Sequence, residues 1–190
     1  MSKFVVIGAA HFDRIVRLKF PARPNRTNTS KTYEKPGGVA ANIASALRLS
    51  DASLPIRFIG AMAEEDEKVA QWLRSACIDA EFLRIDDTSP TYTAILDQHG
   101  ELLLGAADTG LYDRVLAGDL LLLMPEKPRA VVVDANFTAE VLLAVAQSLP
   151  NTAQLFAAGT SVEKAGRLLP VMARLDALVL NRAEASKLPG

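Results

Sequence analysis

The sequence predicts an α/β fold, a parallel sheet with helices on both faces, and three observations support this prediction. Short runs of β-branched and aromatic residues alternate with helical patterns along most of the 190 residues. The strand-like runs are almost continuously apolar, as in strands that helices cover on both sides. Apolar residues make up 49% of the chain and charged residues 23%, a composition that provides a core and excludes a disordered protein.

Each element of the core is expected from a local pattern. Apolar runs predict strands at 4–7, 56–59, 82–85, 130–133, 154–157 and 177–180. Apolar residues recur at helical spacing within 69–76, 142–149 and 165–172. Thr138 and Ser161 precede the second and third of these helices and are candidate N-caps. Because strands and helices alternate, the strands are expected to pair in parallel.

Two segments interrupt the alternation and predict a second, smaller sheet. In 12–36, apolar and basic residues alternate around Val16 and Leu18, the period of a half-exposed strand, before a polar stretch that contains proline. In 91–107, two strand-like runs flank a Gln-His-Gly turn. We expect both segments to form a small antiparallel sheet over the carboxyl ends of the main strands, where α/β folds bind ligands.

Charge, cysteine and histidine content exclude several classes of protein. Lys and Arg number 21 against 22 Asp and Glu, so no excess of positive charge predicts a nucleic-acid polymer or a membrane surface as partner. The single cysteine, Cys77, suits a reducing compartment, and His11 and His99 form no zinc motif. No apolar run approaches the ~20 residues of a membrane span, and 4–10 lacks the cleavage site of a signal peptide. We therefore expect a cytoplasmic protein.

Gly37 and Gly38, followed by a helix of small residues and by Asn42, are the strongest candidate for ligand binding. Paired glycines let a ligand approach the backbone, and they leave free N–H groups directed at it. Asn42 lies one helical turn after Gly38 on the same face, and its amide suits the hydroxyl groups of a sugar. The alternative is a simple turn with Asn42 in solvent, and the motif alone does not decide between the two.

Acidic and amide residues follow the first and the last predicted strands. Asp13 comes six residues after the first strand, where a carboxylate can accept hydrogen bonds from adjacent hydroxyl groups; a turn aspartate is the alternative. Asn181 and Glu184 share one helix face and are placed to orient a magnesium-bound water or a nucleotide phosphate. A capping box explains the same two residues structurally. A dinucleotide site after Gly8 is disfavoured, because the second and third glycines of that fingerprint are absent.

In combination, these motifs resemble the PfkB carbohydrate kinases, which have the ribokinase-like fold. The two hairpin segments resemble that family's β-sheet lid, and the resemblance covers the whole chain. Segments 91–96, 134–136 and 180–185 are most similar to pseudouridine kinases. The residues that carry the resemblance occur in the family's order: Asp13, Gly37, Gly38, Asn42, Asn181 and Glu184.

The resemblance implies ATP-dependent transfer of a γ-phosphoryl group to a hydroxyl group of a sugar or nucleoside. ATP and Mg²⁺ are the implied cofactors, a monovalent cation is left open, and a homodimer formed through the lid is expected. The implied substrate-binding residues are Asp13, Gly37, Gly38, Asn42 and Asn136. Asn181 and Glu184 are implied to bind the nucleotide, with Glu184 contacting Mg²⁺ through a water molecule.

The sequence departs from the family pattern in its length. Members of the family are considerably longer, and the aspartate that acts as their base lies in a second signature in the C-terminal half. We therefore expect 1–190 to be the N-terminal portion of a kinase domain, with the catalytic base beyond residue 190. Asp108-Thr109-Gly110 resembles that signature only superficially, and we interpret it as a connection between lid and core. The alternative class is a non-catalytic sugar-binding protein or assembly subunit, whereas a nucleotide-binding oxidoreductase is disfavoured.

Overall fold

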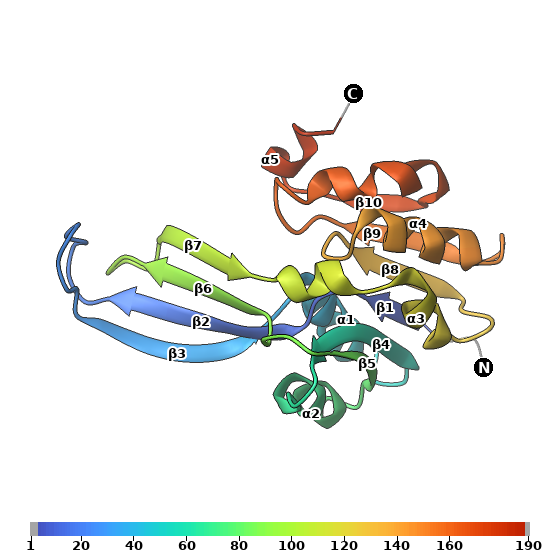
Figure 1. The fold of residues 1–190 in the computed structure, drawn as a ribbon, viewed down its shortest axis with the longest axis horizontal. Coiled ribbons are helices and arrows are strands. Elements are labelled where there is room, and N and C mark those ends of the chain that lie inside the picture. The colour runs from blue at the N-terminus through green and yellow to red at the C-terminus, as the bar shows by residue number, and fades with distance from the viewer. Residues whose placement is uncertain (1–3, 189–190) are drawn as a thin grey trace.

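The computed structural model describes residues 4–188, which form two sheets (Figure 1). The smaller sheet continues from the carboxyl ends of strands of the larger one. Within these residues the larger sheet has six strands in the order β10-β9-β8-β1-β4-β5, and every neighbouring pair is parallel. All six predicted core strands are confirmed, with small shifts at their ends. They are β1 (Phe4–Ile7), β4 (Ile56–Ala63), β5 (Asp79–Ile85), β8 (Ala130–Asp134), β9 (Gln154–Ala158) and β10 (Ala177–Val179).

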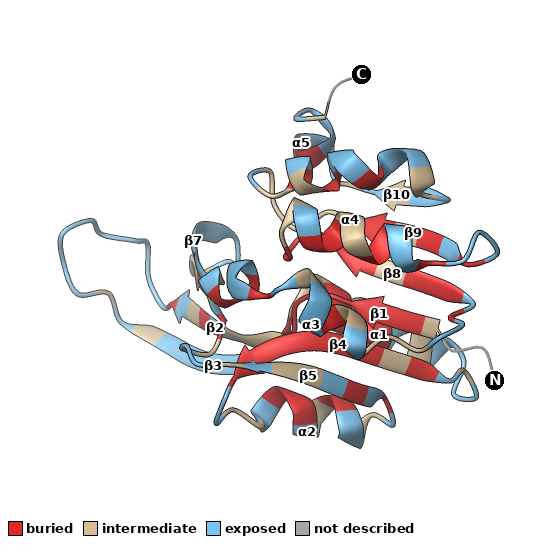
Figure 2. Cartoon of the chain, turned by 45° about the vertical axis from the view of Figure 1, so that its right-hand side comes forward, coloured by how far each residue is buried: buried red, intermediate tan, exposed pale blue. Residues whose placement is uncertain are grey.

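Helices cover both faces of the large sheet, so the core has three layers. Side chains alternate along β1: Val6 packs with one group of helices, and Val5 and Ile7 pack with the other. One group is α1 (Val39–Ser50) and α2 (Lys68–Ser75); the other is α3 (Ala117–Leu122), α4 (Ala139–Ser148) and η2 (Ala165–Arg174). Burial is accordingly concentrated in the central strands and the inner helix faces (Figure 2). The predicted three-layer α/β core is confirmed.

Of the two expected N-caps, Thr138 is confirmed and Ser161 is not. Thr138 caps α4, since its side chain accepts a hydrogen bond from the backbone N–H of Val141 at 3.3 Å. Ser161 does not cap the following helix, which is a 3₁₀ helix that begins only at Ala165. The Ser161 hydroxyl instead accepts from the N–H of Lys164 in the preceding turn. Pro170 lies inside η2 and lacks the N–H that an α-helical hydrogen bond needs.

The smaller sheet, which we call the lid, projects from the core (Figure 1). Its strands are β2 (His11–Leu18), β3 (Ser30–Gly37), β6 (Thr91–Leu96) and β7 (Leu102–Asp108). The hairpins β2–β3 and β6–β7 are antiparallel, but β2 and β6 pair in parallel, so the expectation of a purely antiparallel sheet is wrong. The reason is geometric: both β2 and β6 leave the core at the same edge and run outward side by side.

Two short helices complete the described chain and are relevant to the site. After Thr109, η1 (Gly110–Arg114) returns from the lid to the core and places Tyr112 fully inside it, edge-on to Phe137 at 5.8 Å between ring centroids. The short α5 (Arg182–Ala185) follows β10. No helix in the described part of the chain, residues 4–188, is long and apolar enough to cross a membrane.

Candidate functional site

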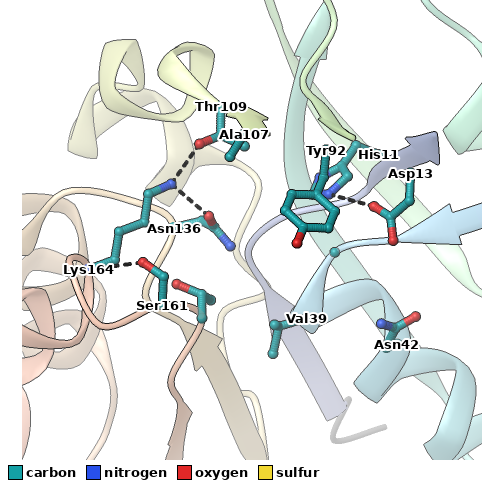
Figure 3. Close-up of a pocket in the computed structure, with 12 residues that line it drawn as sticks. His11, Asp13, Val39, Asn42, Tyr92, Ala107, Thr109, Asn136, Ser161 and Lys164 are labelled. Carbon is teal, nitrogen blue, oxygen red and sulfur yellow. Dashed lines mark hydrogen bonds and ion pairs between the residues drawn. The ribbon is translucent and has the colours of Figure 1, made fainter. Parts of the chain in front are cut away.

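A cavity of about 290 Å³ lies between the lid and the carboxyl ends of β1, β8 and β9 (Figure 3). Its position is the one predicted for ligand binding in an α/β fold. Four of the candidate residues line it together: Asp13, Gly38, Asn42 and Asn136. Other lining residues that the sequence reasoning did not select are His11, Tyr92, Thr109, Thr160 and Lys164.

The Asp13 carboxylate is held at the root of the lid by its neighbours. His11 Nε2 lies 3.2 Å from Asp13 Oδ1, and His11 Nδ1 lies 3.4 Å from the hydroxyl of Tyr112. That hydroxyl in turn donates to the Ala10 carbonyl at 3.1 Å. A Cβ at Gly37, opposite His11 in the sheet, would overlap the Asp13 carboxylate, so a larger residue there would displace Asp13. Gly37 therefore supports Asp13, and its own contact with a substrate stays a prediction.

Gly38 lets the first turn of α1 pack directly on the end of β1. Its φ is +93°, and a Cβ would overlap the Ala9 carbonyl, so both conformation and space require glycine. Ala41 N–H donates to the Ala9 carbonyl at 3.2 Å, and Ala40 N–H donates to Asp134 Oδ2 at 3.1 Å. The expectation of free N–H groups is therefore wrong for these two residues, because other parts of the chain already accept from them.

Asn42 is the group that α1 leaves available at the cavity. Its backbone N–H makes the first bond of the helix, to the carbonyl of Gly38 at 3.0 Å. Its side chain lines the cavity, is exposed, and has no hydrogen-bond partner among residues 4–188. A free amide both donates and accepts, which suits hydroxyl groups, and substrate binding by Asn42 stays a prediction.

Asp134 is the polar centre of the site floor. It is completely buried, and Oδ2 accepts from Ala9 N–H, Ala40 N–H and Asn136 Nδ2, while Oδ1 accepts from Asn136 N–H, all at 2.9–3.1 Å. Burial raises the pKa of this carboxyl above its usual value, against the effect of these donors. A Cβ at Gly8 would overlap the carboxyl, so Gly8 makes room for Asp134. The sequence signal was an acid that ends a continuous apolar strand.

Asn136 and Lys164 form a second polar cluster on the far side of the cavity. The Asn136 amide is used on both sides: Nδ2 donates to Asp134, and Oδ1 accepts from Lys164 Nζ at 2.9 Å. Lys164 Nζ also donates to Thr109 Oγ1 at 2.9 Å. Burial, and after it the nearby charge of Arg167, lower the pKa of Lys164. Asn136 therefore lines the cavity as predicted, but neighbouring side chains hold its amide, and substrate binding by it stays a prediction.

Asn181 and Glu184 form a capping box at α5, and neither lines the cavity. Asn181 N–H donates to Glu184 Oε2 at 3.0 Å, and Glu184 N–H donates to Asn181 Oδ1 at 2.9 Å. The capping box that the sequence offered as an alternative explanation is therefore present. Binding of a nucleotide by these two residues stays a prediction. Within residues 4–188, no group of three or more His, Cys, Asp or Glu side chains can hold a metal ion. Glu184 has one carboxylate oxygen without a hydrogen-bond partner among residues 4–188, so contact with Mg²⁺ through a water molecule stays a prediction.

Comparisons with known proteins agree with this architecture. No family model matches the chain. A pseudouridine-metabolizing bifunctional protein of Schizosaccharomyces pombe is 24% identical over 96% of this chain. Among solved structures, a carbohydrate kinase from Agrobacterium tumefaciens superposes with a TM-score of 0.77 at 28% identity over 99% of this chain. A ribokinase from Arabidopsis thaliana, solved with ribose and ATP, gives 0.70 at 16% identity.

The strand order, the lid and these superpositions define a protein with the ribokinase-like fold of PfkB-type carbohydrate kinases. Within that fold, the curated relative to which the sequence is similar acts in pseudouridine metabolism. The chain spans 25% of the length of that relative, and 63% of the length of each of the two kinase structures.

Proposed function

We propose that this chain provides the substrate site of an ATP-dependent kinase that phosphorylates a hydroxyl group of a sugar or nucleoside. The observation that carries the proposal is the pairing of Asp13 with Asn42 in one cavity under a lid, within a sugar-kinase fold. The Arabidopsis ribokinase with this fold was solved with ribose and ATP, which supports the same pair of ligand classes here.

In this proposal the chain acts by positioning the acceptor. Asp13 accepts hydrogen bonds from neighbouring substrate hydroxyls, and the free amide of Asn42 donates to or accepts from a further one. Gly37 and Gly38 hold these two side chains at a fixed spacing, because each allows a close packing that a Cβ would prevent. The lid covers the cavity and excludes water, which would otherwise compete as phosphoryl acceptor. Phosphoryl transfer depends mainly on positioning of the reactants and on stabilisation of charge, and this chain is proposed to contribute the first of these.

ATP and Mg²⁺ enter the proposal as the phosphoryl donor and its counter-ion. Bound Mg²⁺ would neutralise phosphate charge during transfer. Asn181 and Glu184 are the residues of this chain proposed to lie next to them, with Glu184 accepting a hydrogen bond from a metal-bound water. The support is the spare carboxylate oxygen of Glu184 at the carboxyl end of β10.

The test is titration calorimetry with ribose and with pseudouridine on Asp13→Asn. Replacing the carboxylate by an amide is expected to weaken binding about 10- to 100-fold, because a hydrogen bond to a charged group is lost. Asp108→Asn is the matched control, since Asp108 is exposed and does not line the cavity. Equal affinity of Asp13→Asn and the unaltered chain for the ligand that binds would contradict the role of Asp13.

The second candidate function is that the 190-residue polypeptide binds a substrate but does not transfer a phosphoryl group to it. Transfer to a hydroxyl group needs a residue that takes its proton. Asp13 and His11 line the cavity but lie 3.2 Å from each other, and the proposal uses Asp13 to bind the acceptor. Asp108 is exposed, and Asp113 is paired with Arg167 at 2.6 Å; neither of these two lines the cavity. We therefore expect this polypeptide to bind substrate without phosphorylating it in an assay with ATP and Mg²⁺. Phosphorylation that Asp108→Asn abolishes would overturn that expectation.

We also propose a homodimer formed through the lid. Tyr33 and Leu102, Leu103 and Leu104 are each about half exposed or more on its strands, and β3 and β7 are its edges within the described residues. Exposed apolar side chains and unpaired strand edges favour association. Sedimentation at micromolar concentration is expected to give a dimer that Leu104→Glu dissociates. A monomeric unaltered chain would contradict this proposal.

A further inference from the structure

Lys164 has an unusual environment for a cation. It is half-buried and is the only Lys or Arg among the described residues that line the cavity. Its two recorded partners, Thr109 Oγ1 and Asn136 Oδ1, are neutral oxygens, and no acid within residues 4–188 forms an ion pair with it. An ammonium group can donate three hydrogen bonds, so one N–H has no acceptor within the described chain. The charges of Asp113 and Asp134 act on it without direct contact, so a ligand oxygen within hydrogen-bond reach would stabilise this partly desolvated cation.

A second unsatisfied donor lies on the same wall of the cavity. Thr160 Oγ1 is buried and has no hydrogen-bond partner among residues 4–188. Thr160, Ser161 and Lys164 all follow the carboxyl end of β9 and line the cavity. Both residues lie in the segment that follows β9, so the unpaired Thr160 hydroxyl lies beside the wall that Lys164 forms. A buried hydroxyl without a partner is rare enough to require an explanation.

The two walls of the cavity thus differ in hydrogen-bonding character (Figure 3). Asp13 and Asn42 lie on one wall, where the carboxylate accepts from hydroxyl groups. Lys164 and Ser161 lie on the opposite wall, together with Thr109 and Asn136. A ligand that satisfies both walls carries hydroxyl groups at one end and an oxygen that only accepts at the other.

We propose that Lys164 is a specificity-determining residue that donates a hydrogen bond to a carbonyl or carboxylate oxygen of the substrate. A nucleoside base carries such a carbonyl and a sugar acid such a carboxylate, whereas an unmodified pentose in its ring form has only hydroxyl groups and a weakly accepting ether oxygen. The inference rests on the proposed function, because it assumes that Asp13 binds the hydroxyl end of the same molecule. The lowered pKa of Lys164 agrees with a cation that a ligand oxygen would stabilise.

The test is calorimetry of the 190-residue chain with four separate probes: ribose, pseudouridine, ribonate and ATP with Mg²⁺. Lys164→Met removes the donor and keeps the side chain's length; Lys127→Met, at an exposed lysine away from the cavity, is the control. In Lys164→Met, the affinity for pseudouridine or for ribonate is expected to fall about 10- to 100-fold, and the affinity for ribose by less than about threefold. A loss of affinity for pseudouridine would indicate that Lys164 binds a base carbonyl, and a loss for ribonate would indicate that it binds a carboxylate.

A second variant separates binding from folding. Lys164→Gln keeps a neutral N–H for Thr109 or Asn136, so it is expected to fold normally and still to lose most of the same preference. Equal losses for ribose and pseudouridine in both variants would show a structural role and overturn the inference, as would unchanged affinity for every probe. A loss confined to ATP would assign Lys164 to the nucleotide and also overturn it. Failure of the unaltered chain to bind any sugar or nucleoside would contradict the proposed function itself.

Discussion

The core sheet and the lid are stabilised in different ways, although they meet at one cavity. The central core strands are buried on both faces, and their polar floor is a single carboxyl, Asp134, whose oxygens accept four hydrogen bonds. The lid is a single layer in which Ile15, Leu18 and Ala94 are buried, whereas every residue of β7 is exposed. An ion pair between Lys68 of α2 and Glu34 of β3 links it to the core. The core therefore fixes the floor of the site, and we expect the lid, with fewer buried contacts, to open at a lower free-energy cost.

Asp134→Asn tests the core sheet and has the largest expected effect on the free energy of unfolding. An amide cannot accept all four hydrogen bonds, and its NH₂ group would face N–H donors in a buried space. The free energy of unfolding is expected to fall by about 3 kcal/mol or more. Denaturant unfolding measures this loss. Asp86→Asn, at an exposed acid, is the control and should change little; an equally small change for Asp134→Asn would contradict its role.

Gly38→Ala tests the junction between β3 of the lid and α1 of the core. The positive φ and the overlap with the Ala9 carbonyl predict a loss of about 1–3 kcal/mol, together with weaker binding at the displaced Asn42. Gly118→Ala provides a control of opposite sign. Gly118 lies inside α3 with open space around its Cα, so alanine there should stabilise by about 0.5–1 kcal/mol. If both variants shift the unfolding midpoint in the same direction, the packing assigned to Gly38 is wrong.

The pH dependence of stability sharpens the assignment of Asp134. Burial raises its pKa above 3.8, so the folded chain binds this proton more tightly than the unfolded chain. The resulting stabilisation is present at low pH and is lost as the pH rises through the raised pKa. The free energy of unfolding, relative to Asp134→Asn, should therefore decrease as the pH rises above about 4, the ordinary pKa of an aspartate. A parallel pH profile for the two proteins would show that Asp134 is not the group responsible.

Lys68→Met tests the contact between the lid and the core and has the smallest expected effect on the free energy of unfolding. Lys68 pairs with Glu34 and lies 4.2 Å from the centre of the Phe12 ring, so it contacts both β3 and β2 of the lid. Both members of the ion pair are about half exposed, and global unfolding should hardly change. Hydrogen exchange is expected to become faster in β2 and β3 and to stay the same in β1 and β8. Faster exchange in all four strands would contradict a contact that acts on the lid alone.

Sequence reasoning succeeded where one local pattern determines the structure. Continuous apolar runs located the core strands, and the order of Asp13, Gly38 and Asn42 located one wall of the cavity. The other wall was missed, because the position of Lys164 depends on how β9 and the turn after it meet η1 across the cavity. Asp134 was missed as an anchor, because its partners Ala9 and Ala40 are backbone groups with no sequence signal. Parallel pairing of β2 with β6 likewise depends on where two hairpins leave the core.

That parallel pairing has a consequence for the order in which the molecule folds. Phe12 is paired with Thr91, roughly 80 residues apart in sequence, and β4, α2 and β5 lie between them. Each hairpin can close locally, but the two can join only after the intervening strands have assembled and brought their roots together. The lid therefore completes its sheet only after β4 and β5 have joined β1, and the cavity exists only once a contact of high sequence separation has formed.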